Sequence, residues 1–182
     1  NRPVPSFTDI KGHWSKNMVE DMAAQGIITG YPNGTFRPDR PVTRAEFVSL
    51  LYRGLLWTKA ANQPTFKDEI PDWAADAVAS AVERGAVSGY PDGTFKSSRG
   101  ISRAEMAVII NRLLNLPEIS EQDEQVFSDE AALQAWAVDH VKRVAVAGIL
   151  KGDNGKFRPD DSTTRAEVSA AISRVLAYWV KN

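Results

Sequence analysis

The sequence predicts a mainly α-helical protein made of three helix–loop–helix repeats. One pattern occurs three times in 182 residues, and each copy has two apolar stripes at helical spacing separated by a glycine-rich turn. A copy of fewer than about 50 residues buries too little surface to be stable alone. We therefore expect the copies to share one core, either stacked in a row or closed around a common axis.

Composition excludes several functional classes. The 22 basic and 23 acidic residues give a net charge of −1, so we expect no nucleic-acid partner. No apolar run is long enough to span a membrane. Cysteine is absent, which excludes a disulfide framework and thiol chemistry.

The repeats are read at 7–53, 66–112 and 127–174. The first two align without a gap at an offset of 59, which places Trp14 on Trp73. The third carries two extra residues before Trp136 and one fewer before Phe157, and loops tolerate such changes. We predict three units, 7–59, 66–116 and 127–180, that fold as one cooperative body.

Each copy opens with Phe-x-Asp and then forms its first helix from a tryptophan onward. An apolar stripe follows the ring, and a glycine ends the helix at the C′ position. The stripes are Trp14, Met18, Met22; Trp73, Ala77, Ala81; and Trp136, His140, Val144, and the terminating glycines are Gly26, Gly85 and Gly148.

A glycine-rich turn follows at 30–34, 89–93 and 152–155. Pro-Asn-Gly and Pro-Asp-Gly supply turn chemistry in the first two copies, because proline presets φ and glycine accepts positive φ. The first glycine of each turn, Gly30, Gly89 or Gly152, serves either the turn or the close approach of a ligand to the backbone.

The second helix of each copy begins with a capping box. A Thr or Ser hydroxyl caps the first turn and a Glu three residues later reaches back, at Thr43/Glu46, Ser102/Glu105 and Thr164/Glu167. Capping accounts for these glutamates. The expected buried stripes are Phe47, Leu50, Leu51; Met106, Ile109, Ile110; and Val168, Ala171, Ile172.

Capping does not account for the arginine that follows each cap, Arg44, Arg103 or Arg165. A cation in the first turn opposes the helix dipole by about 0.3–1 kcal/mol. Its guanidinium fork suits a carboxylate, which is either that of an external ligand or that of a neighbouring repeat. If the carboxylate belongs to a ligand, replacing the arginine spares stability and removes binding.

The tryptophans Trp14, Trp73 and Trp136 are either core residues or core residues that also form a groove wall. His13 and His140 occupy non-equivalent positions, which argues against a metal or catalytic site. Asp153-Asn154-Gly155 lacks the spaced ligands of a calcium loop. We expect no catalytic residues, no metal and no cofactor.

The combination of Phe-x-Asp, the segment Gly26-Ile-Ile-Thr-Gly-Tyr-Pro-Asn-Gly-Thr-Phe-Arg-Pro-Asp39 and Thr43-Arg44-Ala45-Glu46 resembles the S-layer homology (SLH) domain family. The resemblance covers all three copies. It implies one pseudo-threefold body, a three-pronged spindle with grooves between neighbours. It also implies a non-catalytic anchor within a larger secreted protein of the bacterial cell surface.

The ligand implied by the resemblance is a secondary cell-wall polysaccharide, often ending in N-acetylmannosamine with a ketal-linked pyruvate. The implied ligand-binding residues are Arg44, Arg103, Arg165, Trp14, Trp73, Trp136, Asp9, Asp68, Asp129, Gly30, Gly89 and Gly152. The second copy reads Lys96-Ser-Ser-Arg-Gly100 and the third lacks the Tyr-Pro turn, so the grooves are not expected to be equivalent.

Two other functions compete with a glycan-binding anchor. A protein-interaction or self-assembly module would use apolar surface around Leu55, Leu56, Trp57, Tyr178 and Trp179. A wall hydrolase would need a pair of carboxylates with separated pKa values in a cleft. The recurring glutamates are already used for capping, which argues against the hydrolase.

Overall fold

A computed structural model describes residues 3–124 and 126–182 and confirms the mainly α class. Within those residues the only β pairings are isolated bridges. The helices are α1 (Lys16–Ala24), α2 (Arg44–Gly54), α3 (Asp72–Glu83), α4 (Arg103–Leu114), the short 3-10 helix η1 (Glu130–Ala132), α5 (Val138–Val146) and α6 (Arg165–Lys181).

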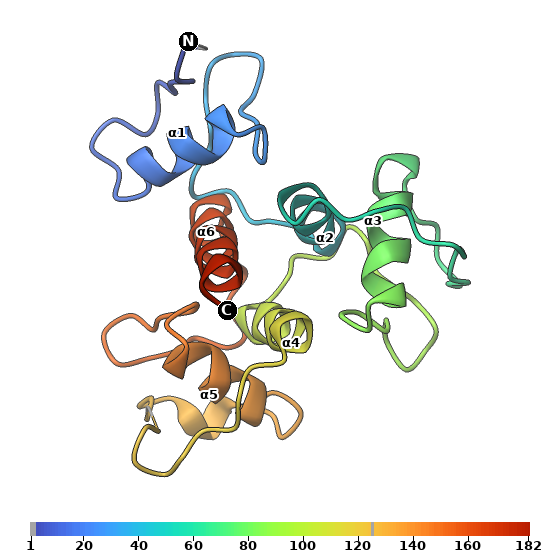
Figure 1. The fold of residues 1–182 in the computed structure, drawn as a ribbon, viewed down its shortest axis with the longest axis vertical. Helices are drawn as coiled ribbons and strands as arrows, with labels where there is room; N and C mark the ends of the chain where they lie inside the picture. The colour runs from blue at the N-terminus through green and yellow to red at the C-terminus, as the bar shows by residue number, and fades with distance from the viewer. Residues whose placement is uncertain (1–2, 125) are drawn as a thin grey trace.

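Helices pack between repeats. The second helix of one copy contacts the first helix of the next: α2 contacts α3, α4 contacts α5, and α6 contacts α1. Helix α6 also contacts α2 and α4, and Figure 1 shows these three helices near the middle with α1, α3 and α5 in separate lobes. The first and last repeats are therefore neighbours, which a linear stack of repeats would not allow.

Backbone hydrogen bonds join the three segments that lead into α2, α4 and α6. The amide of Val42 donates to Thr163 O (2.9 Å), that of Thr163 to Ile101 O (3.0 Å), and that of Ile101 to Val42 O (2.9 Å). The three bonds form a closed ring in which each repeat both donates and accepts. The start of each second helix is thereby tied to the other two repeats.

The predicted hydroxyl caps are confirmed in all three second helices. Thr43, Ser102 and Thr164 are extended and accept from the amide three residues later at 3.1–3.2 Å. The glutamate prediction holds only at α2, where Glu46 Oε1 accepts from the Thr43 amide (3.4 Å). Glu105 and Glu167 accept from arginines of other repeats instead.

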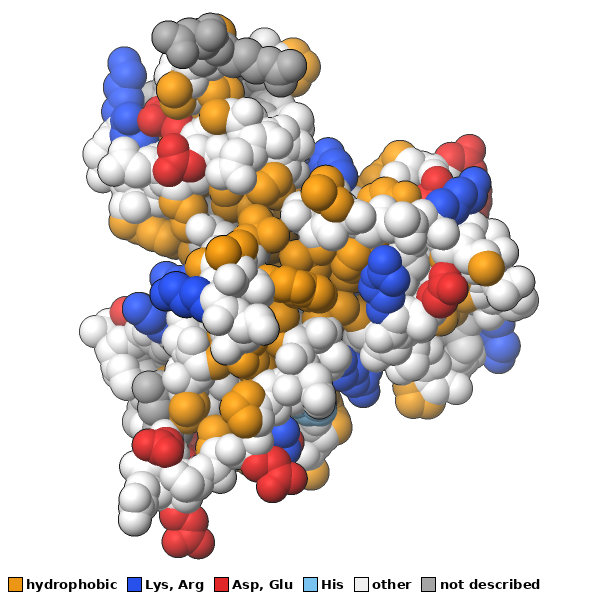
Figure 2. Space-filling model, viewed as in Figure 1, with side chains coloured by type: hydrophobic (Ala, Val, Ile, Leu, Met, Phe, Trp, Pro, Cys, Tyr) orange, Lys and Arg blue, Asp and Glu red, His pale blue; other side chains and the backbone are white. Residues whose placement is uncertain are grey.

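The second helices supply the shared core. All nine residues of their predicted stripes are buried, and Figure 2 shows hydrophobic side chains gathered where the lobes meet. The first helices end as predicted, since Gly26, Gly85 and Gly148 follow their C-caps with φ of 70–76°. No helix in the described part of the chain is long and apolar enough to cross a membrane.

Candidate functional site

Three grooves lie between the lobes, and each is lined by residues from all three repeats. Their volumes of about 400, 540 and 350 Å³ suit a small ligand. We name each groove by its motif arginine. The Arg165 groove contains Trp73, Glu46 and Arg53; the Arg44 groove contains Trp136, Glu105 and Arg112; the Arg103 groove contains Trp14, Glu167 and Arg174.

The motif arginines reach from the start of one second helix into the turn of the next copy. Each Nε donates to the carbonyl of a buried phenylalanine: Arg44 to Phe95 (2.9 Å), Arg103 to Phe157 (2.7 Å) and Arg165 to Phe36 (2.8 Å). This shared contact places the three guanidinium groups in equivalent positions.

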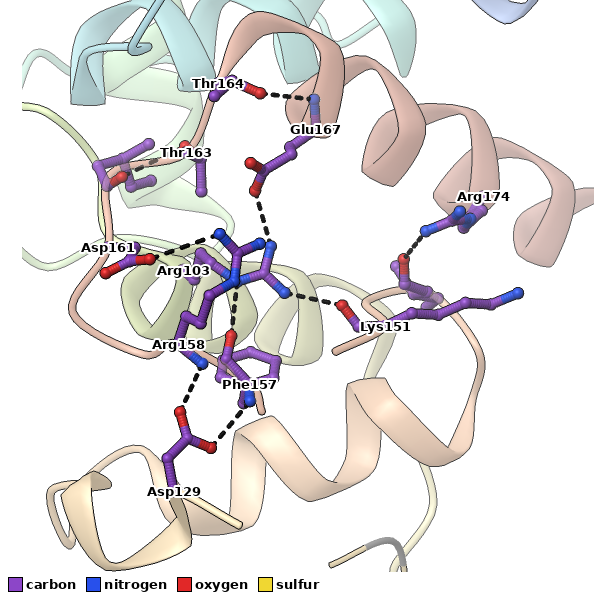
Figure 3. A network of polar contacts seen from close by, with 12 residues as sticks. Arg103, Asp129, Lys151, Phe157, Arg158, Asp161, Thr163, Thr164, Glu167 and Arg174 are labelled. Atoms are coloured by element: carbon purple, nitrogen blue, oxygen red, sulfur yellow. Dashed lines mark hydrogen bonds and ion pairs between the residues drawn. The ribbon is translucent and has the colours of Figure 1, made fainter. Parts of the chain in front are cut away.

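Arg103 is fully engaged within the protein (Figure 3). Its Nη1 donates to Glu167 Oε2 (2.8 Å) and its Nη2 donates to Lys151 O (2.8 Å). Burial lowers the pKa of Arg103, and the carboxylate of Glu167 opposes this by stabilising the cation. With only 3% of the residue exposed, the guanidinium is neutralised and bonded without a ligand.

Arg44 forms the equivalent ion pair in its own groove. It pairs with Glu105, whose Oε2 also accepts from the Tyr90 hydroxyl (2.9 Å). The hypothesis of an inter-repeat salt bridge is therefore confirmed for Arg44 and Arg103. Both arginines are buried and pair with a carboxylate of a neighbouring repeat, so we expect them to contribute to stability as well.

Arg165 lacks the carboxylate partner. Its Nη2 donates to Thr29 O (2.7 Å), but in residues 3–124 and 126–182 no carboxylate lies within 4.0 Å of its guanidinium. Glu46, the equivalent of Glu105, closes the capping box instead. Burial lowers the pKa of Arg165, Tyr31 and Glu46 raise it, and the cations of Arg40 and Arg37 lower it further.

The three tryptophans are groove residues and not core residues. Trp14, Trp73 and Trp136 are 64%, 63% and 50% exposed, whereas the other members of their stripes are buried or, at Met18 and His140, partly buried. Trp14 and Trp136 precede their helices, and Trp73 lies in the first turn of α3. Each ring shares its groove with a motif arginine contributed by a different repeat.

The aspartates of Phe-x-Asp have a positioning role. Both oxygens of Asp9 accept from the backbone, at the amides of Phe36 and Arg37 (2.8 Å each). Asp68 and Asp129 hold the equivalent pairs of amides at 2.7–2.9 Å. The clamped phenylalanines are the ones whose carbonyls accept from the arginines. The expectation of a groove-lining aspartate is replaced by action through the backbone, because none of the three lines a groove.

These clamps make stability sensitive to acid. Burial acts to raise the pKa of Asp9, Asp68 and Asp129, but the amide hydrogen bonds outweigh it and leave each pKa below its ordinary value of 3.8. The unfolded chain then takes up protons at higher pH than the folded chain. The stabilisation is complete above pH 3.8 and is lost as the pH falls through the lowered folded values.

We predict that Asp129→Asn weakens the fall in melting temperature between pH 5 and pH 2, because an amide does not titrate. Melts across this range, compared with those of the native chain, provide the measurement. Glu69→Gln, at an exposed carboxylate, is the matched control. An unchanged acid slope for Asp129→Asn would contradict the role of the clamp.

The glycines at the start of the turns allow close packing. A Cβ at Gly30 would lie 2.2 Å from Phe7 Cε1, one at Gly89 2.6 Å from Phe66 Cε1, and one at Gly152 2.7 Å from Phe127 Cε1. The opening phenylalanine of each repeat therefore requires the glycine. The sequence suggests two other roles for these glycines, turn geometry and the close approach of a ligand, and neither includes the contact with phenylalanine.

Sequence reasoning missed a second arginine in every groove. Arg53, Arg112 and Arg174 each follow the motif arginine of their own helix by nine residues. The second helix of each repeat packs against helices of other repeats. Each of these arginines therefore lines a groove together with the motif arginine of another repeat. The constant spacing of nine residues is the feature of the sequence that identifies these arginines as a recurring pair.

Comparison with known proteins agrees with the division into three repeats. The family model described as S-layer homology domain matches residues 6–48, 65–107 and 126–169. An endoglucanase of Bacillus sp. strain KSM-635 is 32% identical over 93% of this chain, and the S-layer protein EA1 of Bacillus anthracis is 30% identical over 92%. A cellulosome-anchoring protein of Acetivibrio thermocellus is 37% identical over 60%.

The chain matches only a small part of these relatives. The matched region is 18% of the endoglucanase, 20% of the S-layer protein and 26% of the cellulosome-anchoring protein. Proteins with unrelated names thus share this one segment. With three matches that cover most of its length, the chain belongs to the S-layer homology domain family.

Proposed function

We propose that the chain is a non-catalytic carbohydrate-binding anchor that holds a larger surface protein to a secondary cell-wall polymer of a bacterium. Relatives with this segment include a cellulosome-anchoring protein and S-layer proteins. The endoglucanase shares only 18% of its length with the chain, so the common segment need not carry the enzyme's activity. An anchor explains why one module occurs in such different proteins.

The observation that carries the proposal is the pairing of an exposed tryptophan with arginine in each groove. An aromatic face packs against the C–H face of a sugar, and a guanidinium fork binds a carboxylate with two hydrogen bonds. A sugar with a ketal-linked pyruvate carries both features. We therefore propose pyruvylated N-acetylmannosamine as the unit recognised in the grooves.

We further propose that the three repeats form a pseudo-threefold, three-pronged spindle. The ring of hydrogen bonds through Val42, Ile101 and Thr163 supports this arrangement, as does the contact of α1 with α6. Each groove would then lie between two prongs, open to a polymer that approaches from the wall.

A protein-interaction surface is the second candidate. Leu56 is 86% exposed and Trp179 53%, which favours it, but Trp57 is only 8% exposed and belongs to the core, against expectation. These residues lie outside the three arginine grooves. A variant with Leu56→Ser and Trp179→Ser should therefore bind polymer normally.

We predict that the protein sediments with purified cell-wall sacculi carrying a pyruvylated polymer and remains in solution after acid removes the polymer. Removal of the pyruvate alone should also abolish binding, because the arginine then loses its carboxylate partner. Equal binding to intact and stripped sacculi would contradict the proposal. Loss of binding only in the Leu56/Trp179 variant would favour the protein-interaction function.

A further inference from the structure

We infer that the three grooves differ in availability: the Arg165 groove receives the ligand carboxylate, whereas Glu105 and Glu167 occupy the corresponding position in the other two. The inference rests on the proposed function and assigns that function to one groove. On this inference, Glu105 and Glu167 of the repeat motif determine how many ligands bind to one chain.

The three motif arginines are anchored to the backbone in the same way. Each guanidinium is fixed by a phenylalanine carbonyl through Nε, at 2.7–2.9 Å. Arg103 and Arg165 are fixed a second time through Nη2, to the equivalent carbonyls of Lys151 and Thr29. The remaining Nη1 of Arg103 and that of Arg165 therefore face the same place in their grooves, and Arg44 shares the Nε contact with them.

In two grooves a protein carboxylate already lies at that place. Arg103 Nη1 donates to Glu167, and Arg44 Nη1 donates to Glu105. Tyr90 donates a second hydrogen bond to Glu105, which holds it against the arginine. A ligand carboxylate needs the same donors. It must displace a glutamate and leave that charge without its partner in a partly buried site.

In the Arg165 groove the equivalent residues have other partners. Glu46 accepts from the Thr43 amide, which keeps its carboxylate at the start of α2. Tyr31 aligns with Tyr90, but its hydroxyl accepts from Arg40 Nη1. The guanidinium of Arg37 lies 3.8 Å from the centre of the Tyr31 ring, and that of Arg165 lies 5.1 Å from it. Three cations therefore lie around this ring, and within the groove itself Arg53 lies beside Arg165 as a second cation.

Three carboxylates line the Arg165 groove, those of Glu46, Asp72 and Asp76. Trp73 shares it with Asp72 and Asp76, all three from α3. Asp76 lies 3.6 Å from Lys59, and carboxylates of this kind accept hydrogen bonds from sugar hydroxyls. The groove thus suits an acidic sugar held with its carboxylate toward Arg165 and its hydroxyls toward α3.

The test is titration calorimetry with the methyl glycoside of N-acetylmannosamine bearing a ketal-linked pyruvate. We expect one site per native chain. Arg165→Lys should weaken it about 10- to 100-fold, because the ammonium loses the planar fork. Arg44→Lys and Arg103→Lys should weaken it far less, because glutamates already fill their carboxylate positions. The variant with Leu56→Ser and Trp179→Ser, which lie outside the three grooves, is the matched control and should leave both the affinity and the single site unchanged.

The glutamates allow a second test, in which the expected result is an additional binding site. Glu105→Gln and Glu167→Gln should each add a second site per chain, because a neutral amide competes less well for the arginine than a carboxylate. Glu46→Gln should add none. Thermal melts show which variants are folded. If the Gln variants do not fold, the difference in affinity between Arg165→Lys and Arg44→Lys tests the inference.

Two results overturn the inference and leave the proposed function standing. One is equal occupancy of several grooves in the native chain, and the other is a loss of binding in Arg44→Lys as large as that in Arg165→Lys. If neither the native chain nor the Gln variants bind the glycoside or the polymer, the proposed function fails together with the inference.

Discussion

Replacing Arg103 with Ala is expected to destabilise the protein by on the order of 3 kcal/mol, more than any other change to a motif arginine. The substitution removes three hydrogen bonds and leaves Glu167 without its ion-pair partner in a partly buried site. It also leaves the Phe157 and Lys151 carbonyls without a donor side chain. The measurement is the free energy of unfolding in denaturant at neutral pH.

Arg165→Ala is the matched control, because this arginine lacks a carboxylate partner and is only partly buried. We expect it to cost about 1–2 kcal/mol, from its two hydrogen bonds to carbonyls. The double variant Arg103→Ala/Glu167→Ala should be less destabilised than the sum of the single variants. Equal costs at Arg103 and Arg165 would show that the ion pair contributes little.

Removing the first repeat, residues 1–57, is expected to abolish the cooperative native state of the remaining chain. The truncation takes α1 away from α6 and α2 away from α3 and α6. It also removes Val42, which breaks the ring of backbone hydrogen bonds with Ile101 and Thr163. The apolar faces of α3 and α6 would then meet water, at about 25 cal/mol for each Å² exposed.

The full chain should unfold in a single transition, with calorimetric and van't Hoff enthalpies that agree. Residues 58–182 alone should show no sharp transition, and adding residues 1–57 as a separate peptide should restore one. The opposite outcome, a sharp and independent transition for residues 58–182, would mean that the repeats fold separately.

Local features were predictable because their causes lie within a few residues. The hydroxyl caps at Thr43, Ser102 and Thr164 satisfy amides three residues away, and the C′ glycines end their own helices. The buried stripes of the second helices follow from helical spacing. Glu46 completes its capping box for the same local reason.

Failures of prediction have a common cause, which is contact between repeats. Capping explained Glu105 and Glu167 from the sequence, yet their carboxylates turn to arginines 61 and 64 residues away. The tryptophans begin apolar stripes, but packing between repeats leaves them at least half exposed. Asp9 reaches amides 27 and 28 residues later, a contact that no local rule predicts.

The sequence by itself determined the three repeats, the starts of the second helices, the glycines that end the first helices, the apolar faces of the second helices and the presence of an arginine that local capping did not require. The tertiary structure alone decided which repeat each helix packs against, and therefore which residues share a groove. It also decided that Arg44 and Arg103 are neutralised by glutamates whereas Arg165 is not. The physical reason is that helix capping and apolar periodicity act within one repeat, but an ion pair forms only where packing brings two repeats together.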